Sequence, residues 1–315
     1  MEYDKHIQDM VVGDAVEGAY LMRAVYPKTS SNGKPFLSLT LADRTGTMEA
    51  KVWDYSGPIG KAEEGKAVVL QGTVGEFRGE RQMRVERIRL ADAEDNVKAE
   101  DLVPVAPIDA DDMYQKVVAI LDSMEDPDYR LVCTTMLERH NEAFRRIPAA
   151  KSVHHSFLRG LLMHTGNMVK IADFLGKLYS DTVDHDLLVA GTFLHDFAKE
   201  IEFTFSELGL VTGYSIKGQL LGHLVMGAKE VAKVAEELKI PEDKSVLLQH
   251  LILSHHGEPE YGAAVRPVCA ESELLSYIDK IDSRMEIFRE VFEEVPAGEF
   301  SGRIFALDKK VYHHN

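Results

Sequence analysis

Side chains that bind transition metals recur along the second half of the chain, within segments that have helical patterns. In chain order they are His164, His195, Asp196, His223, His255, His256 and Asp279. Nine of the thirteen histidines fall between His154 and His256, so they are clustered rather than scattered. Imidazole and carboxylate groups suit a borderline divalent metal, and a carboxylate beside a histidine can bridge two ions. The series therefore predicts a metal centre with two ions.

Two members of this series occupy positions that an apolar core would not normally give to a polar group. Asp196 lies in the almost wholly apolar segment LLVAGTFLHDFA. A buried unpaired carboxylate costs several kcal/mol, on the order of the net stability of a domain, and a divalent cation offsets that cost. Each residue alone would equally fit a satisfied core histidine or a salt bridge, whereas the ordered series favours metal. His164 lies on the apolar face of a predicted helix, in phase with Phe157, Leu161, Met168, Ile171, Leu175 and Leu178.

Length and cysteine content indicate a cytoplasmic protein of two domains. The 315 residues exceed the size at which single cores usually stop growing. Cys133 and Cys269 are far apart and form no CxxC pair, which fits a reducing compartment. The sequence has no basic, apolar leader and no stretch of about eighteen apolar residues, so we expect neither secretion nor a membrane span.

The first hundred residues show the alternation of short strands. Apolar and polar residues alternate over 37–41 and over 48–53, with the turn sequence DRTG between these segments. The segment VVLQGTV is a further strand, and in QMRVERIRL the apolar phase shifts between Val85 and Ile88, as it does across a β-bulge. About five strands predict a small β-barrel, and an OB-fold, which binds oligonucleotides, fits the periodicity about as well as an SH3-like barrel.

An acidic segment with two prolines separates these strands from a helical region. Residues 93–110 contain Pro104 and Pro107, lack periodicity and are predicted to form a linker. We therefore expect a β-barrel domain over residues 1–92 and an all-α domain over residues 111–315. The predicted helices span roughly 111–125, 129–145, 156–179, 186–200, 218–239, 243–256 and 271–292.

The charge distribution favours the first domain as the site of contact with nucleic acid. Residues 1–100 carry a net charge of −3, and the remainder carries −13, which repels a polyanion unless metal ions or a basic groove outweigh it. Trp53 and Phe77, together with the arginines, fit a stacking and phosphate-binding surface. They fit equally a tryptophan packed against another domain and a solvated strand face. The only dense basic run comprises Arg78, Arg81, Arg84, Arg87 and Arg89.

The order of the metal-type residues resembles that of the HD phosphohydrolase superfamily. The pattern is H, HDxxK, H, HH and D, and Lys199 supplies its lysine. The segments KSVHHSFLRGLLMHT, GTFLHDFAKE, GHLVMG and ILSHHGEPEYG follow a β-rich region and are similar to the YhaM-type 3′-5′ exoribonucleases, which join an OB-fold to an HD domain. The resemblance covers nearly the whole chain and implies an OB-fold.

The family pattern implies a role for each residue of the series. The first ion would be held by His164, His195, Asp196 and Asp279. The second would be held by His223, His255 and His256, with Asp196 as the bridge. A hydroxide between two divalent ions is a competent nucleophile near neutral pH. On a helix that advances about 100° per residue, Lys199 stands within about 60° of both His195 and Asp196, so its ammonium is predicted to hold a phosphate oxygen.

Neighbouring polar residues have more than one interpretation. Asp282 is an alternative ligand to Asp279, although the predicted packing face runs through positions 274, 278, 281 and 285 and the family pattern favours Asp279. His250 fits a core or supporting residue better than a ligand. The sequence leaves the roles of His154 and His155 open.

Three positions near the first histidine depart from related patterns. Trimetal HD-GYP phosphodiesterases carry a carboxylate where this chain has Gly160, and no GYP tripeptide follows His256, so hydrolysis of cyclic dinucleotides is disfavoured. The YhaM-like pattern has glycine in place of Arg159 and glutamate in place of Met163. The ligand set is intact, but a supporting role of residue 163 at the metal centre is in doubt.

We therefore expect a hydrolase, a metal-dependent 3′-5′ exonuclease that acts on single-stranded RNA, with DNA as an alternative substrate. The expected cofactor is a pair of Mn²⁺ ions, with iron, cobalt, nickel or magnesium as alternatives. A nucleotide or cyclic-nucleotide phosphohydrolase is the second hypothesis, and a non-enzymatic OB-fold adaptor with a nucleotide-sensing HD domain is the third. The sequence does not determine whether the chain forms a homo-oligomer. The predicted catalytic residues are Asp196 and Lys199, and the predicted nucleic-acid contacts are Trp53, Arg78, Arg81 and Arg84.

Overall fold

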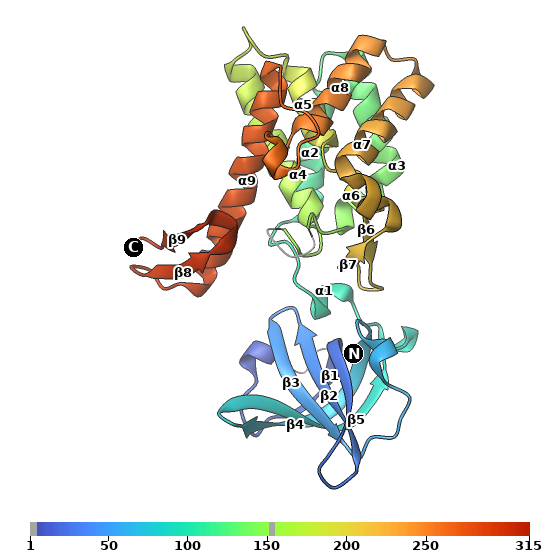
Figure 1. Ribbon diagram of the computed structural model, residues 1–315, viewed down its shortest axis with the longest axis vertical. Coiled ribbons are helices and arrows are strands. Elements are labelled where there is room, and N and C mark those ends of the chain that lie inside the picture. Colours follow the sequence, from blue (N-terminus) through green and yellow to red (C-terminus); the bar gives the residue numbers. More distant parts are fainter. Residues whose placement is uncertain (1–4, 151–154) are drawn as a thin grey trace. The chain divides into compact units, whose positions relative to one another are not determined.

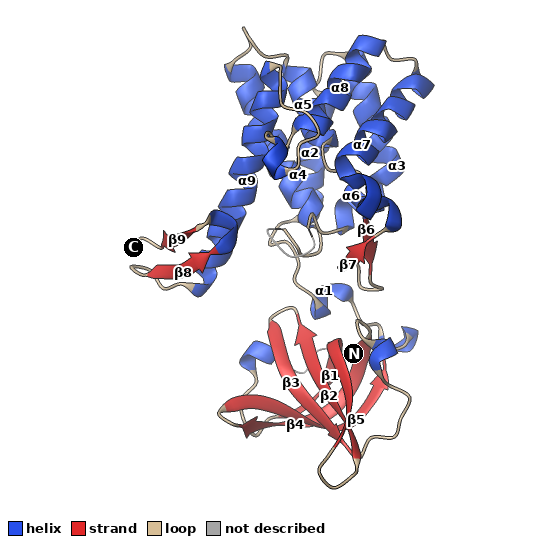
Figure 2. Ribbon diagram, viewed as in Figure 1, coloured by secondary structure: helices blue, strands red, loops and turns tan. Residues whose placement is uncertain are grey.

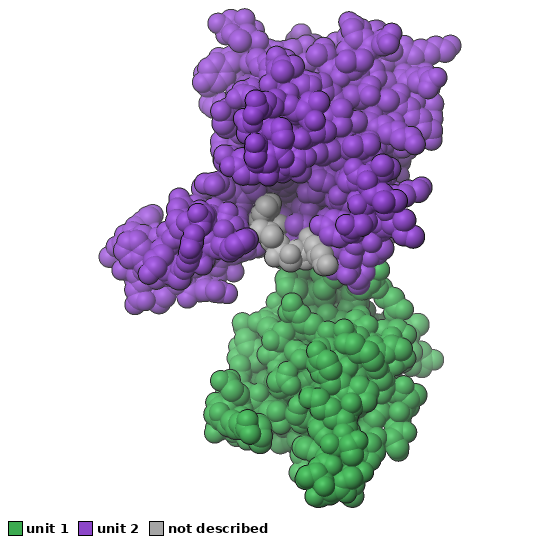
Figure 3. Space-filling model, in the orientation of Figure 1, with its two compact units in different colours: residues 1–105, 205–210 green, residues 106–204, 211–315 purple. Residues whose placement is uncertain are grey.

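The computed structural model describes residues 5–150 and 155–315, and the chain divides into two compact units. The first unit comprises residues up to 105 together with 205–210, and the second comprises residues 106–204 and 211–315 (Figure 3). The first consists mainly of strands and the second mainly of helices (Figure 2). This division separates a barrel from a helical domain.

Five strands close into a barrel in the order β1-β2-β3-β5-β4 (Figure 1). All paired neighbours are antiparallel except β3 and β5, which are parallel. A closed five-stranded barrel of this kind confirms the predicted OB-fold. The strands are β1 Ala15–Thr29, β2 Pro35–Asp43, β3 Gly46–Trp53, β4 Ala67–Phe77 and β5 Glu80–Leu90, with 3₁₀ turns η1 Ile7–Asp9 and η2 Lys61–Glu63.

Two β-bulges give the barrel strands their curvature. The register of β1 against β2 shifts at Arg23, shortly after Leu21, where the pairing of β1 with β4 ends. The β4–β5 register shifts beside Gln71 and leaves Glu86 as the extra residue on β5. This second bulge lies between Val85 and Ile88, where a shift in the alternation of apolar residues predicted it.

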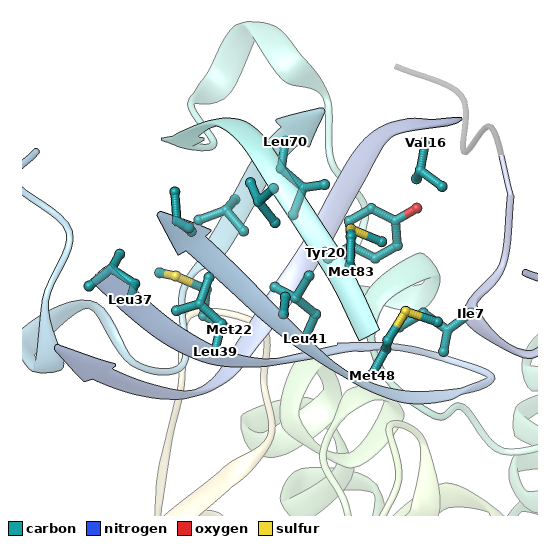
Figure 4. Close-up of a cluster of buried hydrophobic side chains, with 14 of the residues drawn as sticks. Ile7, Val16, Tyr20, Met22, Leu37, Leu39, Leu41, Met48, Leu70 and Met83 are labelled. Atoms are coloured by element: carbon teal, nitrogen blue, oxygen red, sulfur yellow. The ribbon is translucent and has the colours of Figure 1, made fainter. Parts of the chain in front are cut away.

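Alternate side chains of the barrel strands point inward and form one apolar core (Figure 4). On β2 the inward residues are Leu37, Leu39 and Leu41, as the alternation predicted. Met48 of β3 and Met83 of β5 are buried in the same core. The outward side chains of these strands are therefore the ones that can meet another molecule.

The range 93–110, expected to be a linker, contains two short helical segments. They are η3 Ala93–Asp95 and α1 Ala99–Leu102. Arg89 at the end of β5 donates hydrogen bonds of 2.6 and 2.5 Å to the Asp95 carboxylate. These hydrogen bonds lower the pKa of Asp95 to about 2. Arg89 is thus engaged within the protein.

Helices α4 and α5 occupy the middle of the second unit. Helix α4 packs against α2, α3, α5 and α9, and α5 packs against α3, α4, α8 and α9. Side chains of Asp109, Asp126 and Asp184 cap α2, α3 and α5 by accepting hydrogen bonds from first-turn amides. The helices are α2 Ala110–Asp122, α3 Pro127–Arg146, α4 Gly160–Leu178, α5 His185–Leu194, α6 Lys199–Glu202, α7 Ile216–Leu238, α8 Glu242–Ser254 and α9 Ala270–Glu294.

Two small hairpins in the second half of the chain were not predicted. They are β6 Phe203–Phe205 with β7 Val211–Tyr214, and β8 Phe300–Ile304 with β9 Lys309–Tyr312, while η4 Pro259–Tyr261 and η5 Phe305–Leu307 are single turns. Strands of three to five residues are too short to show a clear alternation. The second hairpin packs on the end of α9 through Ile287, Val291, Leu307 and Val311. Among the described residues, none of the helices is both long and apolar enough to cross a membrane.

Candidate metal centre

The helical unit brings all seven residues of the metal-type series close together. His164 lies on α4, Asp279 on α9, and His223 on α7. His195 and Asp196 directly follow the last residue of α5. The pair after α8, His255 and His256, is placed in the same way by the end of that helix.

These side chains form two groups that each have the spacing of metal ligands. His164, His195 and Asp196 offer ligand atoms that lie within 4.8 Å of one another, and so do His223, His255 and His256. Asp279 adjoins the first group, because its Oδ1 lies 3.4 Å from His164 Nε2. Three or four such atoms around one point are what a divalent transition metal needs.

Asp196 stands between the two groups. Its Oδ2 lies 3.2 Å from His195 Nε2 and 3.7 Å from His164 Nε2. Its Oδ1 lies 3.5 Å from His223 Nε2 and 3.9 Å from His255 Nε2. One carboxylate therefore presents a different oxygen to each group of imidazoles.

Hydrogen bonds at Nδ1 turn the Nε2 atom of four histidines toward this centre. His195 and His255 donate from Nδ1 to the carbonyl oxygens three residues earlier, at 2.7 and 2.8 Å. His164 donates to Asp282 at 2.7 Å and His223 to Glu202 at 3.1 Å. Since Nδ1 carries the proton in this arrangement, the Nε2 lone pair is available to bind metal.

Buried atoms at the centre fit a cation. Asp196 Oδ1 and His223 Nε2 are buried and lack a hydrogen-bond partner within residues 5–150 and 155–315. The Nε2 atoms of His164 and His195 face each other at 3.3 Å. Buried polar atoms are normally satisfied, so Asp196 Oδ1 and His223 Nε2, which lie 3.5 Å apart without a donor, indicate a positive charge between them. The seven residues thus fit a pair of divalent ions.

Electrostatics at the two groups differ. Burial and, to a lesser degree, the neighbouring His223 imidazole lower the pKa of His256 to about 4, so His256 is neutral near pH 7. Burial also acts to lower the pKa of His164, but hydrogen bonds to Asp279 and Asp282 outweigh it and raise that pKa to about 10. Positive charge is therefore favoured beside the two carboxylates, as a metal ion would supply it.

Lys199 contacts Asp196 by a geometry different from the one predicted. The helix expected over 186–200 is wrong in its second half, since α5 ends at Leu194 and α6 begins at Lys199. The connecting residues form hydrogen bonds between positions three apart, among them Lys199 N to Asp196 O at 3.0 Å. Residues three apart are eclipsed in such turns. Lys199 Nζ therefore lies 2.6 Å from Asp196 Oδ2.

Sequence reasoning missed two carboxylates that orient the histidines. Glu202 accepts hydrogen bonds from both the backbone N–H of His223, at 2.9 Å, and its ring. Asp282 was considered as a ligand but contacts His164 at Nδ1, on the side away from Asp279. The predicted packing face of α9 is wrong by one position. Leu275, Ile278 and Asp282 are buried, whereas Ile281 and Met285, which were predicted to pack, are exposed. The signal available in the sequence was Asp282, a carboxylate in line with the apolar residues Leu275 and Ile278.

Asp282→Asn is expected to weaken metal binding about 10- to 100-fold, because it removes the charge that holds the His164 imidazole and increases its basicity. Competition with a chromogenic chelator measures this affinity. Asp181→Asn, at an exposed position, is the matched control. An unchanged metal affinity in the Asp282 variant would show that this hydrogen bond does not support the centre.

The other residues that the sequence raised have mainly structural surroundings. His250 Nε2 accepts a hydrogen bond from the Val268 amide at 3.3 Å. His155 is buried, with Nε2 3.4 Å from Asp282, whereas His154 lies outside the described residues. Met163 packs in an apolar cluster with Phe157.

Arg159 stands where the family pattern has glycine, and its backbone has a φ of 64°. A side chain in this left-handed conformation costs about 1–2 kcal/mol, and glycine avoids that cost. Arg159 ends the connection into α4, and its amide donates to the Arg146 carbonyl at 2.8 Å. Arg159 thus enters α4 in a strained backbone conformation.

The barrel residues predicted to contact nucleic acid have unequal surroundings. Trp53 is half exposed and stacks on Phe36, with ring centroids 4.7 Å apart. Arg84 lies on the exposed side of β5 and faces Lys51 of β3 across the parallel ladder. The β4–β5 turn carries Arg78, whose guanidinium lies 5.2 Å from the Phe77 ring centroid.

Arg81, in contrast, is engaged by the N-terminal segment. Its guanidinium donates to the carbonyl oxygens of Ile7, at 3.2 Å, and Met10. An arginine bound in this way fastens η1 to the barrel. Its side chain has fewer donors left for a phosphate than Arg84 has.

A cavity of about 670 Å³ opens onto the metal centre. Its lining includes His164, Asp196, Lys199, His256 and Asp279. This volume is in the range of pockets that enclose small ligands. Five of the seven metal-type residues thus line a space that can hold a molecule the size of one or two nucleotides.

Two family models match the chain. One described as HD domain matches residues 161–284, and one described as OB-fold nucleic acid binding domain matches residues 22–91. Among solved structures, the second OB-fold domain of replication protein A from Methanococcus maripaludis is 18% identical and covers 28% of this chain and 94% of its own, with a TM-score of 0.23.

Curated relatives are similar over almost their whole length. A protein of Shouchella clausii named 3′-5′ exoribonuclease YhaM is 38% identical over 310 residues, which cover 98% of this chain and 96% of the relative. A protein of Listeria innocua with the same name is 36% identical over 313 residues, which cover 99% and 98%. The similarity thus extends over both units of this chain.

Proposed function

The chain belongs to the family of the YhaM 3′-5′ exoribonucleases, and we propose that it removes nucleotides from the 3′ end of single-stranded RNA by metal-dependent hydrolysis of phosphodiester bonds. The observation that carries this proposal is the position of Asp196 between two groups of imidazoles. A carboxylate shared in this way suits two ions, the arrangement that nucleases use for in-line displacement at phosphorus.

In this proposal the seven residues hold two divalent ions, one beside His164 and Asp279 and one beside His223 and His256, with Asp196 shared. Bound by these residues, such ions would supply an activated water near neutral pH and would neutralise charge on the phosphoryl group. Nitrogen-rich ligand sets with carboxylates favour a transition metal over magnesium, and we propose Mn²⁺. Fixed Nδ1 hydrogen bonds keep the imidazoles oriented, which limits reorganisation during the reaction.

Lys199 is proposed to hold a phosphate oxygen. Its ammonium lies 2.6 Å from Asp196 Oδ2. With divalent ions bound to Asp196, the ammonium would be available to interact with the substrate. It lines the cavity and is a donor that carries positive charge, so it can stabilise charge that develops on a non-bridging oxygen.

Product analysis with end-labelled RNA tests the function. With added Mn²⁺, a 5′-labelled RNA is expected to shorten progressively from its 3′ end and release nucleoside monophosphates, and a DNA of the same sequence shows whether the 2′-hydroxyl matters. Blocking the 3′ end with a terminal phosphate is expected to slow the reaction. If RNA stays intact while nucleotides or cyclic nucleotides are hydrolysed, the protein is a nucleotide phosphohydrolase instead.

The barrel is proposed to capture single-stranded RNA on the outward face of β2, β3 and β5. There Phe36 and Trp53 supply stacking surface, while Lys51 and Arg84 supply positive charge. OB-fold domains bind single strands through this combination of aromatic and basic side chains. The positive residues also offset the repulsion expected from the net charge of the chain, −16.

Trp53→Ala is expected to raise the Kd for a single-stranded oligonucleotide about tenfold, because one base–aromatic stack is worth roughly 1–3 kcal/mol. Trp53→Phe keeps an aromatic ring and should lose less. Trp53 is the only tryptophan, so quenching of its fluorescence by RNA reports the contact in the unaltered protein. Unquenched fluorescence together with an unchanged Kd in the alanine variant would exclude this face.

A further inference from the structure

The cavity beside the metal centre continues along one side of α9. Its lining includes Ser276, Asp279, Lys280, Ser283 and Arg284, which form two adjacent stripes on that helix. Asp279 belongs to the metal-type series, and Lys280 and Arg284 lie beside it. A molecule whose end reaches the metal centre would therefore run past these two cations.

Lys280 and Arg284 carry charge that the protein does not neutralise. Neither forms an ion pair within the part of the chain that the structure describes, although the region from residue 101 onward carries a net charge of −13. Of the other carboxylates that line this part of the cavity, Glu258 pairs with Arg266 at 2.9 Å, whereas Glu273 contacts the neutral Tyr277 hydroxyl and keeps its charge. The two cations Lys280 and Arg284 outnumber this one carboxylate, so the cavity retains positive charge where it leaves the metal-type residues.

An exposed aromatic ring lies opposite this side of α9. Tyr261 ends the 3₁₀ turn η4, is 70% exposed and lines the cavity. Lys280 Nζ lies 5.7 Å from the centroid of its ring. A ring face beside an ammonium is the pairing with which proteins hold a base and its phosphate in a single strand.

We propose that this cavity holds the 3′-terminal nucleotides of the RNA, with Tyr261 stacked on a base and Lys280 and Arg284 bound to phosphates upstream of the bond that is cleaved. The inference rests on the proposed exonuclease function and adds its substrate-binding residues. Four residues of helix advance about 6 Å, close to the distance between successive phosphates of an extended strand. Lys280 and Arg284 therefore match neighbouring phosphates.

Steady-state kinetics on oligouridylates of two to six nucleotides test the phosphate contacts. Lys280→Gln and Arg284→Gln are each expected to raise KM for the hexamer about five- to tenfold, as expected for loss of one charge-assisted hydrogen bond, with a smaller rise for the dimer. Each should also flatten the dependence of log(kcat/KM) on log salt by about 0.7, the contribution of one phosphate on a single strand. The metal content should stay that of the unaltered protein.

Matched variants separate these contacts from general effects. Lys229→Gln removes an exposed charge on α7, away from the cavity lining, and should change neither KM nor the salt dependence. Tyr261→Ala is expected to raise KM about tenfold, and Tyr261→Phe should restore most of the loss because it keeps the stacking ring. If the enzyme is active and the cavity variants, like Lys229→Gln, change neither KM nor the salt dependence, the proposed binding of RNA in this cavity is wrong. The proposed exonuclease function would still stand.

Photocrosslinking tests the same inference without turnover. A hexauridylate with a 3′-terminal 4-thiouridine, added to the full-length protein without divalent metal, is expected to crosslink within residues 257–284, and Tyr261→Ala should reduce the yield there. Moving the 4-thiouridine to the 5′ end should move the crosslink out of that range. Crosslinks of the 3′-terminal base confined to the barrel would overturn the inference even if the protein proved to have another enzymatic activity.

Discussion

Asp196→Ala is expected to abolish RNA hydrolysis, with a loss of more than about 10⁴-fold in kcat, because residues that act as one catalytic unit fail together when one is removed. The two oxygens of this carboxylate face different groups of imidazoles, so its loss affects both proposed ions. Elemental analysis of the purified protein should find close to two divalent ions per chain and clearly fewer in the variant.

Binding of RNA distinguishes this effect from unfolding. The stacking and basic residues proposed to capture RNA lie on the barrel, and the variant should therefore retain most of its affinity for a long single strand. Asp196→Asn keeps the size of the side chain but weakens one oxygen as a ligand, and it should retain part of the metal. A protein that is fully active without metal would refute the two-ion centre.

Lys199→Met is expected to retain both ions and to lose about 10²–10³-fold in kcat, the effect of removing one donor that stabilises developing charge. A protonated lysine donates hydrogen bonds and cannot bind a cation, so metal content and catalysis should separate in this variant. Lys217→Met, an exposed substitution at the start of α7, is the matched control. Unchanged turnover, or loss of metal together with turnover, would remove Lys199 from the proposed role.

The sequence predicted the barrel because the alternation of apolar and polar residues within each strand shows which side chains point inward. Leu37, Leu39 and Leu41 alternate with outward residues, and a single break in the alternation marked the bulge between Val85 and Ile88. Periodicity alone did not distinguish an OB-fold from an SH3-like barrel. That choice depends on which strands pair, and the parallel contact of β3 with β5 decides it.

Local patterns misplaced two parts of the candidate site. The continuous helix predicted over 186–200 is wrong, because the mainly apolar sequence continues through the turn between Leu194 and Lys199, which periodicity cannot detect. The packing face predicted for α9 is wrong by one position, because Asp282 is buried by its contact with His164 rather than excluded as a charge. Both errors involve polar residues whose burial depends on a partner distant in the sequence.

The sequence by itself determined the domain order and predicted which residues hold metal, because the side-chain chemistry of a residue and the periodicity of a strand are local properties. Only the tertiary structure decided how the ligands are arranged. Asp196 reaches both groups of histidines, and His164 is oriented by a carboxylate 118 residues away, through packing of α4 against α9. Such contacts cannot be predicted from the separation of the two residues along the sequence, because the packing of the helices sets the distance between their side chains.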